Sequence, residues 1–152
     1  IRLGLVGSEM CIRDSVIAKL RTQNRSDSKR FNIVYSTMLV TDDKELEDAK
    51  AQLSFRLVDS PLSIKEEIGM TKEDELEIKS ALREGGPQLA GKFVKEEWVE
   101  EFTLTGNFES IREELFRFFE AGIDEYQLPV YELQSAEKDI ERVATLFNGK
   151  LS

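Results

Sequence analysis

Residues 31–40 read FNIVYSTMLV and form the clearest strand pattern in the chain. It is rich in β-branched and aromatic residues and carries no charged side chain. A run that is apolar on both faces is typical of a strand buried in a parallel sheet, whereas a half-exposed strand alternates apolar and polar residues. The stretch therefore predicts a buried parallel strand.

Helical patterns follow this strand. Asp42 and Glu45 form a capping-box pattern, which predicts a helix from there to about residue 57. A charged helical stretch follows at residues 64–82, with a break at residues 69–71 where Thr71 and Asp74 would start a new helix. The first of these helices would bury one stripe of side chains: Leu46, Ala49, Leu53 and Leu57.

The next segments continue the alternation. The Gly85-Gly86-Pro87 sequence ends the charged helix, and residues 88–101 predict another helical stretch that ends near Trp98. Residues 102–105 predict a short strand. Residues 108–121 predict a helix that Gly122 caps, with these residues on one face: Ile111, Leu115, Phe118 and Phe119.

The last two predicted elements are a strand and a helix. Residues 124–131, DEYQLPVY, predict the strand, and Ser135 opens the helix. The helix would turn four apolar residues inward: Ile140, Val143, Ala144 and Phe147.

This order of elements indicates a parallel α/β fold. Strands that alternate with helices, without hairpin signals, are joined by right-handed crossovers. Three strands cannot close a barrel, and a (β/α)8 barrel needs roughly 250 residues. We therefore predict an α/β chain of about three parallel strands with helices, forming the C-terminal part of a (β/α)8 TIM barrel.

Composition excludes several classes of function. The 152 residues carry 21 Lys and Arg against 30 Asp and Glu, a net charge of −9, and show no basic stripe for nucleic acid. No apolar run reaches the roughly 18–20 residues of a membrane helix. The absence of histidine removes the commonest general base and metal ligand. One cysteine makes neither a disulfide framework nor a zinc cluster, so we predict no metal site.

The first fifteen residues have a different origin. Residues 5–14, LVGSEMCIRD, look like the translation of a transposase-type DNA sequencing adapter. We therefore treat residues 1–15 as a non-native, adapter-derived segment and residues 16–152 as the protein domain. The alternative is a native strand at residues 3–6 followed by a loop. Without Cys11 the chain has no cysteine, and this, with the acidic charge and the lack of a signal sequence, predicts a cytoplasmic protein.

In a βα barrel, functional groups gather at the carboxyl ends of the strands, and a phosphate site often follows the last two. Ser36 and Thr37 lie within or at the end of the first predicted strand. Thr105, Gly106 and Asn107 follow the second, where N–H groups at a helix N-terminus can hold an anion. We predict that these five residues bind a cofactor. The alternative for Asn107 is that it only caps its helix.

Other candidates have simpler interpretations. Residues 129–131 follow the third strand, and Tyr35, Tyr126 and Tyr131 could donate hydrogen bonds to a ligand or only bridge core and water. Gly86, Gly91 and Lys92 nearly spell a P-loop, but Phe93 replaces its Ser/Thr and a helix precedes it, so a helix break is favoured. The acidic pairs at residues 66–67, 96–97 and 100–101 indicate a solvated face, and Trp98 a core position.

Four segments in series suggest a family. They are LREGGP at residues 82–87, VKEEWVEEF at 94–102, LTGNFESI at 104–111 and EAGIDE at 120–125. In this order they resemble the end of the bacterial-luciferase-like superfamily, particularly the branch of methylenetetrahydromethanopterin reductase and other deazaflavin-dependent oxidoreductases. Residues 16–152 would then be a partial luciferase-like barrel domain.

The resemblance implies an activity for the parent enzyme. It would bind FMN or the deazaflavin coenzyme F420 in the barrel mouth and transfer hydride to or from a small-molecule substrate. The resemblance is also compatible with a parent enzyme that forms a homo-oligomer. The protein's part would be positioning and electrostatics. Two departures stand out, because the family's Gly-Thr-Pro is Gly106-Asn107-Phe108 here, and its Gly-Ser-Pro is Leu128-Pro129-Val130. The strands that form most of the flavin pocket would lie upstream, so we expect this chain alone to be inactive.

Two other interpretations stay open. The chain could be a small cofactor-free α/β interaction domain that binds a partner through its open sheet edge. It could also belong to a barrel enzyme of unrelated chemistry, such as an aldolase-like protein, although no lysine lies at a strand end for a Schiff base.

Overall fold

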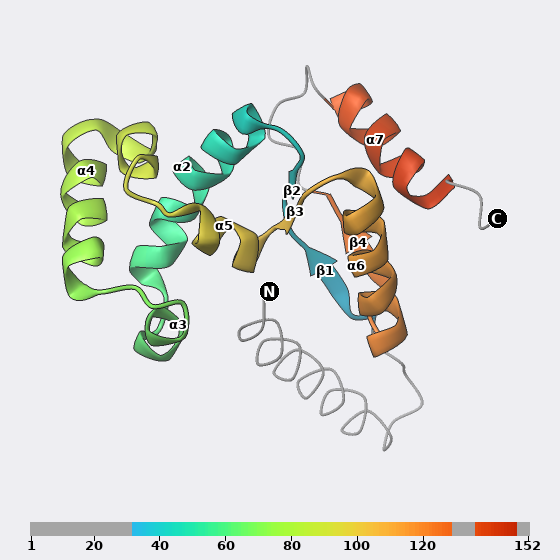
Figure 1. Ribbon diagram of the computed structural model, residues 1–152, viewed down its shortest axis with the longest axis horizontal. Coiled ribbons are helices and arrows are strands. Elements are labelled where there is room, and N and C mark those ends of the chain that lie inside the picture. Colours follow the sequence, from blue (N-terminus) through green and yellow to red (C-terminus); the bar gives the residue numbers. More distant parts are fainter. Residues whose placement is uncertain (1–31, 129–135, 149–152) are drawn as a thin grey trace. The chain divides into compact units, whose positions relative to one another are not determined.

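The computed structural model describes residues 32–128 and 136–148 (Figure 1). The predicted adapter-derived segment and residues 129–131 lie outside the described residues. The chain divides into two compact units, one made of Thr37–Ile111 and the other of the residues up to Ser36 and from Arg112 on.

The unit of Thr37–Ile111 is a short parallel strand pair with helices between its strands (Figure 1). Strand β2 (Leu39–Val40) pairs with β3 (Leu104–Thr105), so parallel strands are confirmed here. The intervening chain forms four helices, which are α2 (Asp43–Asp59), α3 (Leu62–Glu67), α4 (Lys72–Gly91) and α5 (Glu96–Phe102).

Helix α2 begins at the predicted cap residue and packs as predicted, but its capping box is incomplete, because Glu45 bonds to Thr41 and not to the Asp42 N–H. The Asp42 carboxylate accepts a hydrogen bond from the Glu45 N–H at 2.8 Å, and the Glu45 carboxylate accepts one from the Thr41 N–H at 2.8 Å. Of the predicted stripe, Ala49, Leu53 and Leu57 are buried and Leu46 is partly buried. Helix α4 packs along α2 so closely that a Cβ on Gly91 would lie 2.9 Å from the backbone nitrogen of Ala51.

Helix α4 confirms the predicted capping box and corrects the predicted stop. Thr71 and Asp74 hydrogen-bond reciprocally at its start. Gly86, with a φ of 71°, breaks the helical path, but Pro87 starts a further stretch of helix that runs to Gly91. The break is therefore a kink, since proline lacks only an N–H that the first turn of a helix leaves unpaired.

The predicted helix over residues 88–101 is wrong in its extent. The chain turns after Gly91, with the Phe93 N–H bonded to the Ala90 carbonyl oxygen at 3.0 Å, and buries Val94. Helix α5 starts only at Glu96 and runs to Phe102, so β3 begins at Leu104. The turn is favoured because it buries Val94 in the core, and this burial is worth more free energy than the helical propensity of the segment.

Trp98 lies in the core of this unit, as predicted. Its side chain is 1% exposed, and its indole Nε1 donates a hydrogen bond to the Ile68 carbonyl oxygen at 2.9 Å. An indole N–H buried in this way needs a partner, and the carbonyl after α3 supplies it. The cluster around it contains these buried residues: Met38, Val40, Ala49, Leu53, Leu57, Met70, Ile78, Ala81, Ala90, Val94 and Val99.

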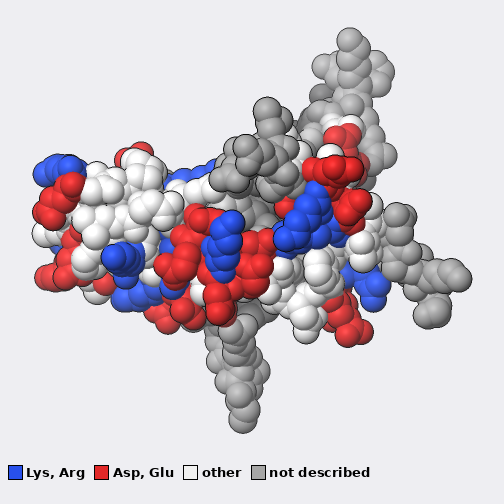
Figure 2. Space-filling view, turned by 90° about the horizontal axis from the view of Figure 1, so that it is seen from above, with Lys and Arg blue, Asp and Glu red and all other residues white. Residues whose placement is uncertain are grey.

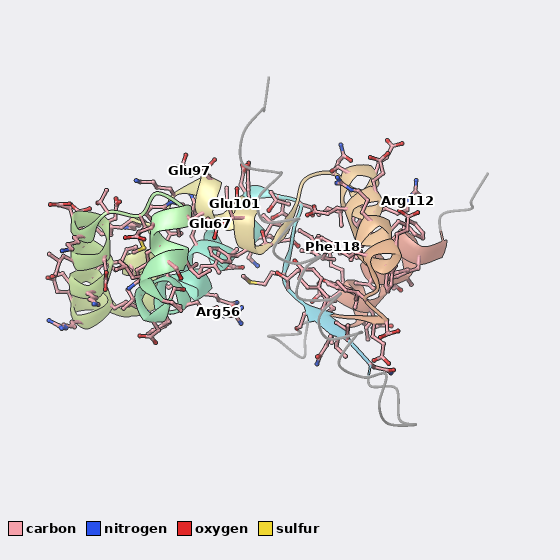
Figure 3. The ribbon with its side chains drawn as sticks, turned by 90° about the horizontal axis from the view of Figure 1, so that it is seen from below. Arg56, Glu67, Glu97, Glu101, Arg112 and Phe118 are labelled. Carbon is pink, nitrogen blue, oxygen red and sulfur yellow. The ribbon has the colours of Figure 1, made fainter. Side chains whose placement is uncertain are left out.

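The other unit also contains a parallel pair. Strand β1 (Val34–Ser36) pairs with β4 (Glu125–Gln127) in parallel. Helix α6 (Phe108–Ala121) belongs to this unit except for its first turn. Helix α7 (Ala136–Asn148) follows β4. Phe118 lies on α6 (Figure 3). Its ring meets the Tyr35 ring of β1 edge to face, with centroids 4.8 Å apart. Ile111, Leu115 and Phe118 are buried and Phe119 is half-buried, so the predicted face of α6 is confirmed.

Two predictions about these elements are wrong. Residues 31–40 do not form one strand, because Thr37 and Met38 interrupt it between β1 and β2, which pair with different strands. On α7, Ile140 is 62% exposed and Phe147 43% exposed, while Leu146 is buried. The helix turns its Leu146 side inward, so only part of its apolar face is covered by the described residues.

Candidate functional site

The carboxyl ends of β2 and β3 lie side by side, which is where a βα protein places functional groups. The register pairs Leu39 with Leu104 and Val40 with Thr105. The N–H of Gly106 then donates a hydrogen bond to the Val40 carbonyl oxygen at 3.0 Å. The segment Thr105-Gly106-Asn107 thus lies at the carboxyl edge of this strand pair, which we call the β2–β3 edge.

Gly106 makes the sharp turn from β3 into α6. Its φ is 134°, a conformation that residues with a side chain rarely adopt. A Cβ at this position would lie 2.6 Å from the Ser110 hydroxyl oxygen. The turn therefore requires glycine, both for its backbone conformation and for the space beside Ser110.

Asn107 caps α6. Its side-chain oxygen accepts a hydrogen bond from the Ser110 N–H at 2.9 Å, and its carbonyl oxygen accepts one from the Ile111 N–H at 3.1 Å. This is the geometry of an N-cap residue. The predicted alternative, a cap, is therefore what the side chain does here, and its binding of a cofactor stays a prediction.

The hydrogen bonds around Thr105 determine whether its hydroxyl group can donate to a ligand or only accept from one. Thr103 Oγ1 donates to the Val99 carbonyl oxygen at 2.8 Å, and the Thr103 and Thr105 hydroxyl oxygens are 2.7 Å apart. Because the Thr103 proton is used on Val99, the Thr105 hydroxyl must be the donor in that second bond. Its remaining lone pairs can only accept, so Thr105 suits a ligand hydroxyl or N–H rather than a phosphate oxygen.

Thr37 lies away from the Thr105–Asn107 segment, and Ser36 belongs to the other unit. Ser36 is an exposed residue at the end of β1, in register with Gln127. Thr37 is 6% exposed and donates its hydroxyl proton to the Phe102 carbonyl oxygen at 2.6 Å. Thr37 precedes β2, so it lies at the amino edge of the β2–β3 pair, opposite Thr105. The structure brings Thr105, Gly106 and Asn107 together, but Thr37 does not join them.

Charge differs between the two helix starts at the β2–β3 edge. The first turn of α2 is covered by the carboxylates of Asp42 and Glu45. The α6 start is capped by the neutral Asn107 and has a single carboxylate, Glu109, in its first turn. Since a helix N-terminus attracts anions and neighbouring carboxylates repel them, the α6 start suits an anionic group better than the α2 start does.

Three ionisable groups with shifted pKa values, Lys50, Asp74 and Glu75, lie on helices of the Thr37–Ile111 unit. Burial opposes the charged form of Asp74, but hydrogen bonds from Thr71 and Lys95 hold its pKa below the usual value. Hydrogen bonds from Lys79 and Lys65 lower the pKa of Glu75. For Lys50, burial works against the charge, but hydrogen bonds to Glu47 and Glu96 raise its pKa. The contacts of these three groups are within and between helices, so their role is structural.

Lys65 is a buried cation that the sequence did not single out. Its side chain is 10% exposed, and its Nζ lies 2.7 Å from the Val58 carbonyl oxygen and 3.0 Å from Glu75 Oε1. Val58 lies in the last turn of α2, where carbonyl groups have no partner within the helix. Lys65 therefore caps α2 and joins it to α4 through Glu75, which is a structural role.

The remaining candidates give no second site. Gly86 and Gly91 both lie within α4, so they do not form a phosphate loop after a strand. Among residues 32–128 and 136–148, no three acidic or cysteine side chains are placed to hold a metal ion. Within these same ranges, no helix has the length and apolar character needed to cross a membrane. On the face in Figure 2, basic side chains are interspersed with acidic ones and form no stripe.

Comparison of this chain with solved structures identifies its class of fold. The chain is an α/β protein with a few parallel strands, and its fold is similar to that of a luciferase-like barrel enzyme. That enzyme is the coenzyme F420-dependent tetrahydromethanopterin reductase from Methanopyrus kandleri, with a TM-score of 0.69 and 21% sequence identity. The likeness covers 86% of this chain and 40% of the reductase chain. No protein-family model matches the chain, and no curated protein matches it.

Proposed function

We propose that this chain is part of a luciferase-like oxidoreductase that transfers hydride between a flavin or deazaflavin and a small molecule. One observation carries the proposal, which is the likeness of 86% of the chain to a coenzyme F420-dependent reductase. The series of segments at residues 82–125 supports it independently, because it points to the same branch of enzymes from the sequence alone.

The β2–β3 edge is the proposed contact with the cofactor. Thr105 would accept a hydrogen bond from a cofactor hydroxyl or N–H, because its own proton is used on Thr103. Gly106 has no side chain to obstruct a ligand, and the α6 start, with Glu109 as its one first-turn carboxylate, suits an anionic group such as a phosphate better than the α2 start does. The bound cofactor would supply the hydride chemistry, and these residues would only position it.

The chain as given would not catalyse the reaction alone. It spans about two fifths of the reductase that it resembles in fold. Lys50, Asp74 and Glu75, whose pKa values are shifted, stabilise helices rather than face the β2–β3 edge. We propose that residues upstream in a longer polypeptide complete the pocket and contact the substrate.

Cofactor titration tests this proposal. The longer protein, expressed from the reading frame recovered upstream, would be titrated with FMN and with coenzyme F420, followed by the fluorescence of each. We expect one of them to bind with a Kd of about 10 μM or tighter. The 152-residue chain is the matched control and should bind at least about 100-fold more weakly. Binding of neither compound below about 1 mM would overturn the proposal.

A second function has one observation in its favour. Each described strand belongs to a two-stranded sheet, β1 with β4 and β2 with β3. Open strand edges of this kind can add a strand from another chain. A cofactor-free interaction domain would therefore be the interpretation to adopt if the titration fails while the protein is folded.

A further inference from the structure

The apolar face of α7 is incompletely covered. Ile140 and Phe147 are seven residues apart, which places them on the same side of the helix, and they are 62% and 43% exposed. Val143 and Ala144 lie between them and are half-buried. Phe147 still has one aromatic contact, because its ring lies 6.0 Å from that of Phe119 on α6.

The position of α7 in the chain shows what such a face should cover. In βα proteins, a helix that follows a strand packs back on the sheet, over its own strand and the next parallel strand. Helix α7 follows β4, and β4 belongs to a two-stranded sheet whose other member is β1. Parallel strands are normally buried on both faces, yet β1 and β4 each have two exposed residues out of three.

We propose that the α7 face defined by Ile140 and Phe147 is the surface against which a further parallel strand and its helix pack. The occupant is another βα unit of the same polypeptide, placed beside β4. Three fifths of the F420-dependent reductase has no counterpart in this chain, so that fold contains the units that such a surface needs. This inference rests on the proposed function, since it takes the chain to be one part of a longer barrel.

The first test compares a polar substitution in two lengths of the protein. Ile140→Asp should leave the melting temperature of the 152-residue chain unchanged, because the side chain is exposed there. In the longer protein the same substitution should lower it by about 5 °C or more, since a charge would then be buried. Leu76→Asp is the control, because Leu76 on α4 is 65% exposed and should tolerate the change in both lengths.

The second test does not depend on folding of a destabilised variant. In the 152-residue chain, Ile140→Cys and Leu76→Cys would each be made with Cys11→Ser, which removes its single cysteine. The longer protein would not contain the predicted adapter-derived segment, so any cysteine in its upstream part would be replaced by serine instead. Ellman's reagent should modify both thiols rapidly in the 152-residue chain. In the longer protein, the thiol at position 140 should react at least about 100-fold more slowly, and that at position 76 at its former rate.

The outcomes separate this inference from the proposed function. Equal reactivity of the position-140 thiol in both lengths, with no effect of Ile140→Asp on stability, overturns the inference even if the longer protein binds FMN or F420. Protection of position 140 in a protein that binds neither compound supports the packing surface and rejects the cofactor. Self-association of the 152-residue chain that Ile140→Asp abolishes, without protection in the longer protein, would make a second copy the occupant instead.

Discussion

The backbone N–H of Gly106 donates a hydrogen bond to the carbonyl oxygen of Val40 at 3.0 Å. This bond lies just beyond the last register pair of β2 and β3, so it fixes where β3 ends and α6 begins. It also requires the unusual backbone of Gly106, which a side chain would disturb. The position of the candidate site thus depends on one parallel ladder and one glycine.

Replacement of that glycine should destabilise the protein. Gly106→Ala combines a φ of 134° with a Cβ placed 2.6 Å from the Ser110 hydroxyl, and should lower the free energy of unfolding by about 1–3 kcal/mol. In a Ser110→Ala background the same change should cost less, because only the backbone strain remains. Urea unfolding, followed by fluorescence of the single Trp98, measures both. Equal costs in the two backgrounds would show that the Ser110 contact is irrelevant.

One substitution can separate the capping role of Asn107 from its proposed role in ligand binding. Asp caps helices as well as Asn does, so Asn107→Asp should change the free energy of unfolding by less than about 0.5 kcal/mol. The added charge would repel an anionic cofactor group at the α6 start, and we expect cofactor affinity of the longer protein to fall at least about tenfold. Unchanged affinity would show that Asn107 serves only as a cap.

Lys65 should matter more to stability than its neighbour Lys79. Lys65→Ala removes the cation from the Val58 carbonyl and Glu75, and should cost about 2–3 kcal/mol of unfolding free energy. Lys79 pairs with the same Glu75, but its side chain is 38% exposed, so Lys79→Ala should cost about 0.5 kcal/mol or less. Chemical denaturation of both variants is the measurement. Similar losses would mean that burial of Lys65 contributes nothing.

Acid should weaken the start of α4 through Asp74. Burial opposes its charge, but hydrogen bonds from Thr71 and Lys95 keep the pKa of folded Asp74 below the usual value of about 3.9. The unfolded state therefore binds protons first, and stability from this group, present above about pH 4, is lost as the pH falls through the lowered pKa. Asp74→Asn should be less stable than the parent at pH 7 by about 1 kcal/mol, and this difference should shrink toward pH 2–3. A difference that stays constant from pH 7 to pH 2 would contradict this role.

Local signals predicted much of the fold. The caps at Asp42 and Thr71 and the breaks at Gly69 and Gly86 depend on neighbouring residues, so the sequence reveals them directly. The Thr105–Asn107 turn was found in the same way, because a glycine and a cap residue follow a short strand.

Other features depend on residues far apart in the chain. Lys65 can be buried because α4 places Glu75 beside it. The Thr105 hydroxyl donates to Thr103 because the Thr103 proton is used on the Val99 carbonyl of α5. Ile140 differs, because it is exposed although its apolar side chain predicts burial. An apolar side chain in the sequence does not show which surface covers it. Periodicity identifies apolar faces, and only tertiary structure shows which of them are covered.

The central proposal is that this chain is part of a longer βα-barrel oxidoreductase. The most direct measurement is to amplify outward from the coding region of residues 98–128 in the source DNA and to read upstream of the codon for Val16. We predict an open reading frame that continues for roughly another 150–200 residues of alternating strand and helix patterns. A start codon close to Val16 would contradict the claim and leave a small free-standing α/β protein.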